Sequence, residues 1–125
     1  MIVNALRKGG MATLLLVLCL TARAQQPPLH QVQAVVDGLR SPEQAAYAQE
    51  HLHAVAGVRV ARVDHNTRNL MLQVDPACGM NADDLGALLQ PLGLGIRCFS
   101  RRPVGPGAFH HLDPRTCGQP PLETR

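Results

Sequence analysis

The segment 36–44, Val-Asp-Gly-Leu-Arg-Ser-Pro-Glu-Gln, predicts a point where a strand ends and a helix begins. Ser41 is typical of a helix N-cap, and Pro42 suits the first helical position because the amide hydrogen that proline lacks would find no helical partner there. Gln44, three residues after the cap, predicts a capping box. The rest of the fold is predicted outward from this junction.

Apolar residues follow two different spacings along residues 31–100. Residues 31–36, 58–63, 70–74 and 96–100 alternate with a period of two, which predicts four strands. Helical spacing predicts one helix ending at Gly57 and another beginning at Asn81. With right-handed crossovers, this order predicts an α+β, ferredoxin-like βαββαβ sandwich, a four-stranded antiparallel sheet with two helices on one face. In the last strand we expect Cys98 to face the core and Phe99 the open side.

Residues 1–24 have the pattern of a secretory signal peptide. Arg7 and Lys8 precede an apolar stretch at 13–20, and residues 22–24, Ala-Arg-Ala, provide the small side chains found before a cleavage site. The apolar stretch is too short for a stable membrane span. We therefore expect an exported protein, periplasmic or secreted, with no membrane anchor after signal cleavage.

The chain is predicted to divide into four parts: the signal peptide at 1–24, a leader at 25–30, one domain at 31–101 and a Pro- and Gly-rich tail at 102–125. The five prolines of the tail predict an extended segment rather than a third helix. We expect this tail to cover the open face of the sheet, which is amphipathic enough to dock Phe109 or a partner protein.

Charge and aromatic content exclude one class of partner. The chain carries 12 Lys and Arg against 9 Asp and Glu. The signal peptide removes three cations, Arg7, Lys8 and Arg23, and no acid, so the remaining chain is neutral. With one Tyr, two Phe and no Trp, it has neither the basic footprint nor the stacking platform of a nucleic-acid-binding protein.

One tetrapeptide and four dipeptides lie at the predicted ends of strands and helices: Val-Asp-Gly-Leu at 36–39, Gly-Val at 57–58, Val-Asp at 63–64, Val-Asp at 74–75 and Leu-Gly at 92–93. With these markers, residues 32–100 resemble the heavy-metal-associated (HMA) domain family. That family includes small copper chaperones and the N-terminal modules of metal-pumping ATPases. The resemblance implies the same ferredoxin-like fold.

The resemblance also implies where a metal site would lie. The family holds Cu(I) in a Gly-Met-x-Cys-x-x-Cys loop, which aligns with residues 38–44. Ser41 and Gln44 replace the two cysteines, and their hard, neutral oxygens do not compete for a soft cation that prefers sulfur. We expect both residues to cap the helix, so this loop is predicted to hold no metal and the protein to have no cofactor.

The alternative is a copper site at the opposite end of the domain. Its candidate ligands are His30, Cys78, Met80, His110, His111 and Cys117, with His53 nearby. A mixed set of imidazole, thiolate and thioether groups suits copper. Each residue also has an ordinary structural role open to it, in a turn, a helix end or the tail.

Three cysteines remain after signal cleavage, so one is free or bonds to another chain. Cys78 follows the third strand and Cys117 lies in a tail that leaves from the same end, so we predict a structural Cys78–Cys117 disulfide. Cys98 would then be a buried, inert thiol. A Cys78–Cys98 bond is the alternative pairing.

The sequence shows no residue arrangement typical of an enzyme. His51 and His53 cannot share a helix face, and no histidine has a serine or cysteine partner near a glycine elbow. We therefore predict a non-enzymatic, exported HMA-like binding module that interacts with another extracytoplasmic protein. The alternative is an extracytoplasmic copper-binding or copper-trafficking protein.

Overall fold

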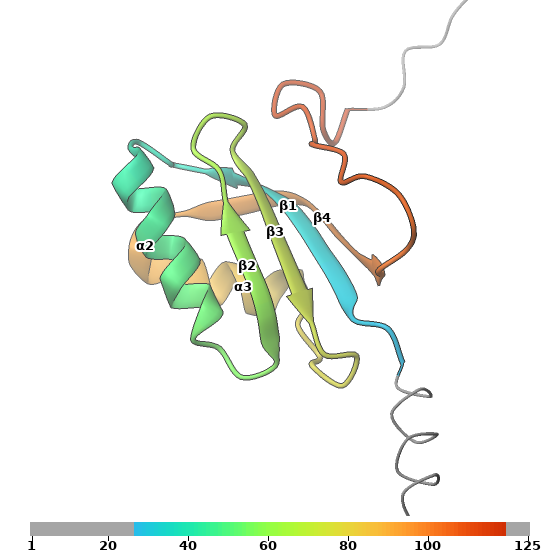
Figure 1. Ribbon diagram of the computed structural model, residues 1–125. Helices are drawn as coiled ribbons and strands as arrows, with labels where there is room; N and C mark the ends of the chain where they lie inside the picture. Colours follow the sequence, from blue (N-terminus) through green and yellow to red (C-terminus); the bar gives the residue numbers. More distant parts are fainter. Residues whose placement is uncertain (1–26, 120–125) are drawn as a thin grey trace, which may run out of the picture.

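The computed structural model describes residues 27–119, whose arrangement is shown in Figure 1. The elements in chain order are β1 (His30–Asp37), α2 (Pro42–His53), β2 (Val58–Val63), β3 (Asn69–Val74), α3 (Ala82–Leu89), the short 3₁₀ helix η1 (Gln90–Leu92) and β4 (Gly95–Pro103). The predicted signal peptide and residues 120–125 lie outside this range. No helix between residues 27 and 119 is long and apolar enough to cross a membrane.

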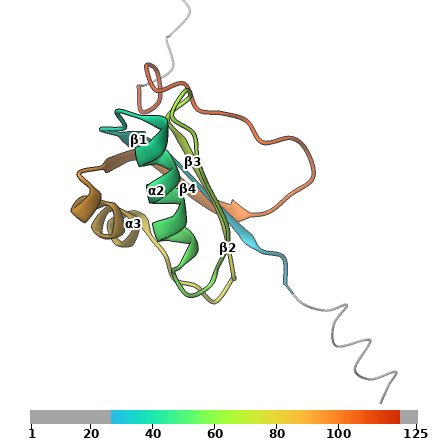
Figure 2. The ribbon, with the colours of Figure 1, turned by 60° about the vertical axis from the view of Figure 1, so that its left-hand side comes forward.

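The four strands form one antiparallel sheet in the order β2-β3-β1-β4. Figure 2 shows both helices on one face of this sheet and the C-terminal tail, drawn in red, on the other side. This arrangement confirms the predicted ferredoxin-like fold.

The hydrophobic core lies between the sheet and the two helices. Its fully or almost fully buried residues alternate along the central strands and recur at helical spacing in the helices: Val32, Ala34, Val36, Leu70, Leu72, Val74, Ala45, Ala48, Leu52, Leu85 and Leu89. Small alanines on α2 let that helix pack close to the sheet. These are the positions that the two apolar spacings predict.

Helix α3 begins with a capping box at the predicted residue. The Asn81 side-chain oxygen accepts a hydrogen bond from the Asp84 amide at 2.8 Å, and the Asp84 carboxylate accepts one from the Asn81 amide at 3.1 Å. Two otherwise unpaired amides at the helix start are satisfied in this way.

Strand β4 contains a β-bulge that the sequence analysis did not predict. Its pairing with β1 shifts between Gln33 and Val35, so the alternation of side chains along β4 reverses at this point. Phe99 consequently packs against the core, and Cys98 adopts a left-handed backbone with φ of 57°. The expected inward position of Cys98 and outward position of Phe99 are therefore wrong.

The disulfide joins Cys98 to Cys117, so the predicted Cys78–Cys117 pairing is wrong. Cys78 is the free cysteine among the described residues and is half-buried. The bulge turns Cys98 away from the core, and the tail runs back along the sheet instead of staying at the end where β4 finishes. Cys117 therefore meets Cys98 and not Cys78.

Hydrogen bonds hold the tail on the open face of the sheet. The Asn69 side-chain amide donates to the Leu112 carbonyl at 2.8 Å and accepts from the Leu112 amide at 2.7 Å. The Gln33 side chain donates to the His110 carbonyl at 2.6 Å. Gln33 and Asn69 are each only 3% exposed, so two polar strand residues are buried beneath the tail with their hydrogen bonds satisfied.

Candidate functional site

The loop between β1 and α2 aligns, by the predicted resemblance, with the metal-binding loop of the HMA family, and its backbone is closely packed. Gly38 has φ of 94°, and a Cβ added there would lie 2.9 Å from the Gly93 carbonyl oxygen. Leu39 is 6% exposed and belongs to the core. Close packing against the α3–β4 connection therefore fixes this loop.

Ser41 and Gln44, which the resemblance aligns with the two cysteines of the HMA family, make the capping contacts of α2. The Ser41 hydroxyl accepts a hydrogen bond from the Gln44 amide at 3.1 Å. The Gln44 side-chain oxygen accepts from the Arg40 amide at 2.8 Å, one residue before the amide that a regular capping box uses. Both oxygens are thus engaged by backbone donors at the helix start.

The donor set of this loop does not fit Cu(I). Soft Cu(I) selects thiolate and thioether sulfur, and residues 38–44 contain no sulfur atom. The oxygens of Ser41 and Gln44 are neutral, hard and already bonded to backbone amides. The residues of this loop therefore offer no ligand set that suits Cu(I).

Three members of the alternative copper set, His30, Cys78 and Met80, lie at one end of the domain, where β1 begins and β3 ends. The His30 Nδ1 atom lies 3.1 Å from the Arg101 Nε atom, and the Met80 carbonyl accepts from Arg101 Nη1 at 3.0 Å. Met80 is 6% exposed and packs in the core. An arginine, which cannot bind a cation, occupies the space between His30 and Met80.

Cys78 and the members on the tail do not complete a site with His30 and Met80. Cys78 is near the Ala56 carbonyl, and Cys117 is in the disulfide. His110 and His111 lie on the tail, where the His111 ring packs edge-on against Phe109 at 5.0 Å between centroids. Among residues 27–119, no group of three or more His, Cys, Asp and Glu side chains is placed to hold a metal ion.

Charge is unevenly distributed between the layers of the fold, a feature that the net charge conceals. Helices α2 and α3 carry Glu43, Glu50, Asp83 and Asp84 and no basic residue other than histidine. Every arginine of the described range lies in the sheet, its loops or the tail. Mapping charges onto the predicted elements would have found this separation from sequence.

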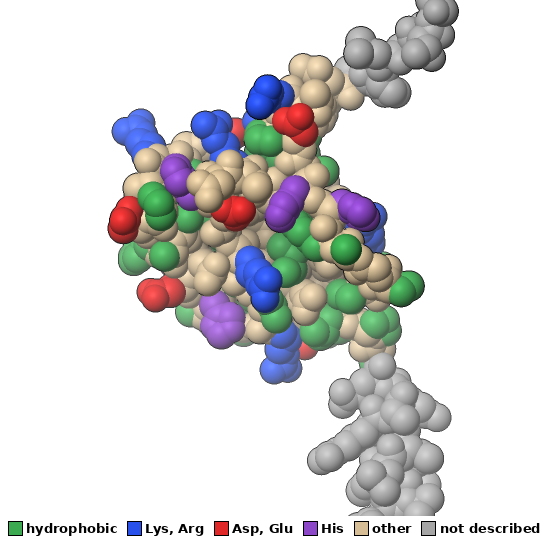
Figure 3. Space-filling view, turned by 45° about the horizontal axis from the view of Figure 1, so that its top comes forward, with side chains coloured by type: hydrophobic (Ala, Val, Ile, Leu, Met, Phe, Trp, Pro, Cys, Tyr) green, Lys and Arg blue, Asp and Glu red, His purple; other side chains and the backbone are tan. Residues whose placement is uncertain are grey.

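A surface groove lies between the β2–β3 hairpin and the tail. It has a volume of about 630 Å³ and is lined by Asn66, Thr67, Arg68, Arg97, His111, Leu112, Asp113, Pro114 and Arg115. We call it the arginine groove. In Figure 3, several blue arginine side chains lie along the upper edge of the molecule, with red carboxylate side chains beside them.

Internal hydrogen bonds order the hairpin beside this groove. The Asp64 carboxylate accepts from the Asn66 amide at 2.9 Å and from the Thr67 hydroxyl at 3.0 Å. The hydrogen bond from the Asn66 amide has the largest effect on the pKa of Asp64 and lowers it. Burial raises this pKa by a smaller amount, the bonds from Thr67 lower it further, and the net result is a pKa below the usual value. The anionic form of Asp64 therefore holds the hairpin turn.

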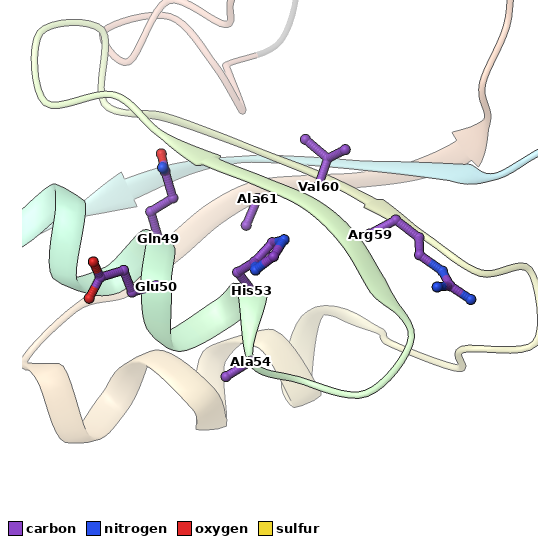
Figure 4. Close-up of a pocket in the computed structure, with 7 residues that line it drawn as sticks. All are labelled: Gln49, Glu50, His53, Ala54, Arg59, Val60 and Ala61. Carbon is purple, nitrogen blue, oxygen red and sulfur yellow. The ribbon is translucent and has the colours of Figure 1, made fainter.

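A second hollow, of about 500 Å³, lies between α2 and the edge strand β2 (Figure 4). The Gln49 side chain accepts from the Val63 amide at 3.2 Å and so covers part of the strand edge. Arg59 points away from the hollow in Figure 4 and forms an ion pair with Asp75 at 2.9 Å. Because its charged groups do not converge, this hollow is a weaker candidate than the arginine groove.

Comparison with known proteins identifies the fold. No protein-family model and no curated protein sequence matches the chain. One similar solved structure is the N-terminal domain of a potential copper-translocating P-type ATPase from Bacillus subtilis in the Cu(I)-loaded state, at 17% identity and a TM-score of 0.50 over 55% of this chain and 85% of that one. Another is a proposed copper-ion-binding protein from Bacillus anthracis str. Ames, at 14% identity and a TM-score of 0.50 over 55% and 96%. The chain thus has an HMA-like, ferredoxin-like fold.

Proposed function

We propose that this protein is an exported, non-enzymatic binding module of HMA-like fold. It binds another extracytoplasmic protein and holds no copper in the loop between β1 and α2, which we call the first loop. The observation that carries the proposal is the engagement of Ser41 and Gln44 in helix capping. The fold keeps the loop but uses these two positions to satisfy backbone amides. An HMA-like domain that binds no metal in this loop would act through contacts of its surface with another protein.

Two features support export, and two more support protein binding. The signal-like residues 1–24 and the Cys98–Cys117 disulfide both fit an oxidising, extracytoplasmic compartment. The tail is bonded across the open face of the sheet, which gives the domain an ordered surface of its own beside the hairpin. An acidic helical layer and a basic sheet side would orient a charged partner as it approaches.

The alternative is an extracytoplasmic copper-binding protein. It is favoured by the similarity to a domain solved in the Cu(I)-loaded state and by the free thiol of Cys78. In this alternative the ligands come from the set His30, Cys78, Met80, His110, His111 and Cys117. Cys117 would first have to leave the disulfide, so the alternative predicts copper uptake that depends on reduction.

Anaerobic Cu(I) titration of the mature protein, in competition with a Cu(I) chelator, tests the proposal. We expect no stoichiometric uptake by the wild type, with the disulfide intact or reduced. The matched variant Ser41→Cys/Gln44→Cys restores the two family sulfurs and should take up one Cu(I) ion, since the fold already positions both residues. Stoichiometric uptake by the wild type that Cys78→Ser or His110→Ala abolishes would overturn the proposal in favour of the copper-binding alternative.

A further inference from the structure

The arginine groove has two walls that the fold holds in place. The Val36 amide donates to the Arg68 carbonyl at 2.8 Å, which ties the hairpin wall to β1. Hydrogen bonds between Asn69 and Leu112 and the disulfide at Cys117 hold the tail wall. A groove that is already formed loses little conformational entropy when it binds a ligand.

Guanidinium groups with unused donors line the groove. Arg97 uses Nε to bind both Asp37 carboxylate oxygens, at 3.1 and 3.0 Å, and Nη1 to contact the Cys117 sulfur at 3.4 Å. Its Nη2 group has no hydrogen-bond partner among residues 27–119. Arg68 and Arg115 take part in neither of the two ion pairs of the described residues. A guanidinium has five N–H donors in a planar fork that matches a carboxylate.

Carboxylates within the groove do not neutralise these arginines. Asp113 accepts from the Arg115 amide at 2.9 Å, and its carbonyl accepts from the Thr116 and Cys117 amides, so it shapes the tail turn. Asp37 is committed to Arg97. Because Arg97 is paired with Asp37, the groove lining keeps Arg68 and Arg115 against the single carboxylate of Asp113, which leaves a small excess of positive charge.

The backbone conformation of Arg68 also indicates that its side chain has a role in binding. Its φ of 57° is in the left-handed region, which Gly or Asn adopts with less strain than arginine. The hairpin nevertheless has an exposed arginine there, with its side chain lining the groove. This placement is easier to explain if the guanidinium contributes to binding.

We propose that the arginine groove binds an acidic segment of the partner protein through hydrogen bonds from Arg68, Arg97 and Arg115 to its carboxylates. This inference rests on the proposed function and names the partner chemistry that the function requires. A volume of about 630 Å³ is too large for one carboxylate and suits several side chains of an extended peptide. A neutral protein without aromatic platforms does not suit a nucleic acid.

Fluorescence anisotropy of a labelled hexaglutamate peptide with the mature, oxidised protein tests the proposal. Each exposed guanidinium–carboxylate pair contributes a factor of about two to five in affinity, so Arg68→Gln/Arg115→Gln should weaken binding about tenfold. The matched control is Arg102→Gln, an exposed arginine further along β4 and outside the groove, which should change the affinity less than about twofold. Raising the salt concentration should weaken wild-type binding because ions screen exposed charges.

A second variant tests whether binding requires the tail wall of the groove to be held in place. Cys117→Ala frees the tail wall without removing a charge, so peptide binding should weaken while circular dichroism of the domain stays unchanged. Labelled hexaglutamine is the neutral control peptide and should not bind.

Four results would overturn the inference: no binding of hexaglutamate, equal weakening by Arg102→Gln, displacement of the peptide by inorganic phosphate at equal concentration, or concentration-dependent self-association that the double variant abolishes. The last would assign the groove to the acidic helices of a second copy. These results leave the Cu(I) titration unaffected, so failure of the acidic-segment inference can be distinguished from failure of the proposed function.

Discussion

Removing the Cys98–Cys117 disulfide with Cys117→Ala should lower the free energy of unfolding by about 3 kcal/mol. The two cysteines are 19 residues apart in sequence, and closing a loop of about 20 residues restricts the unfolded chain by roughly that amount. The hydrogen bonds of the tail to Gln33 and Asn69 lie inside this loop. They should become weaker once the tail is free at its far end.

Urea denaturation monitored by circular dichroism measures this loss, with Cys78→Ala as the matched control. Cys78 is a half-buried free thiol, so its replacement should cost about 1 kcal/mol or less. If Cys78→Ala costs as much as Cys117→Ala, the tail is bonded to Cys78 and the assigned pairing is incorrect. A loss below about 0.5 kcal/mol for Cys117→Ala would show that the bond does not constrain the unfolded chain.

Three further changes test other parts of the structure. Ser41→Ala removes the N-cap of α2 and should cost about 1 kcal/mol in urea denaturation; an unchanged midpoint would contradict the capping role. Gly38→Ala should cost more than about 1 kcal/mol because its Cβ would meet the Gly93 carbonyl, whereas Gly86→Ala, in open space on α3, should stabilise by up to about 1 kcal/mol. Because the pKa of Asp64 is lowered by folding, its stabilising contribution should be full above the unfolded pKa and be lost as pH falls through the folded value. The acid limb of stability should therefore be shallower in Asp64→Asn, and an NMR-titrated pKa at or above the usual value would refute this.

The fold could be predicted because local signals agreed with one another. Period-two alternation located the strands, helical spacing located the helices, and Ser41 and Asn81 marked the helix starts. Each of these signals depends on neighbouring residues only. Right-handed crossover connections then left few topologies to consider.

The disulfide could not be predicted because it depends on a long-range irregularity. The bulge near Cys98 arises from the pairing of β4 with β1, which no local pattern in β4 reveals. Without it, Cys98 would face the core and Cys78 would be the natural partner of the tail. One inserted residue therefore changed both the facing of Phe99 and the choice of cysteine pair.

The two candidate sites also differ in whether they depend on local or on long-range structure. The capping roles of Ser41 and Gln44 are local, and the hydrogen bonds show them. The arginine groove brings together Arg68, Arg97 and Arg115 from a hairpin, a strand and the tail, so it exists only once the tail has folded back. That no metal binds at the first loop stays a prediction.

The most direct test of this central claim is the ¹⁵N NMR spectrum of the oxidised mature protein during addition of Cu(I), which is diamagnetic. The amides of Arg40 and Gln44 report on the loop, because one bonds the Gln44 side chain and the other the Ser41 hydroxyl. We predict that neither amide signal shifts on addition of one equivalent of Cu(I). Shifts of both signals that saturate at that equivalent would show that the loop still binds copper, and would contradict the account.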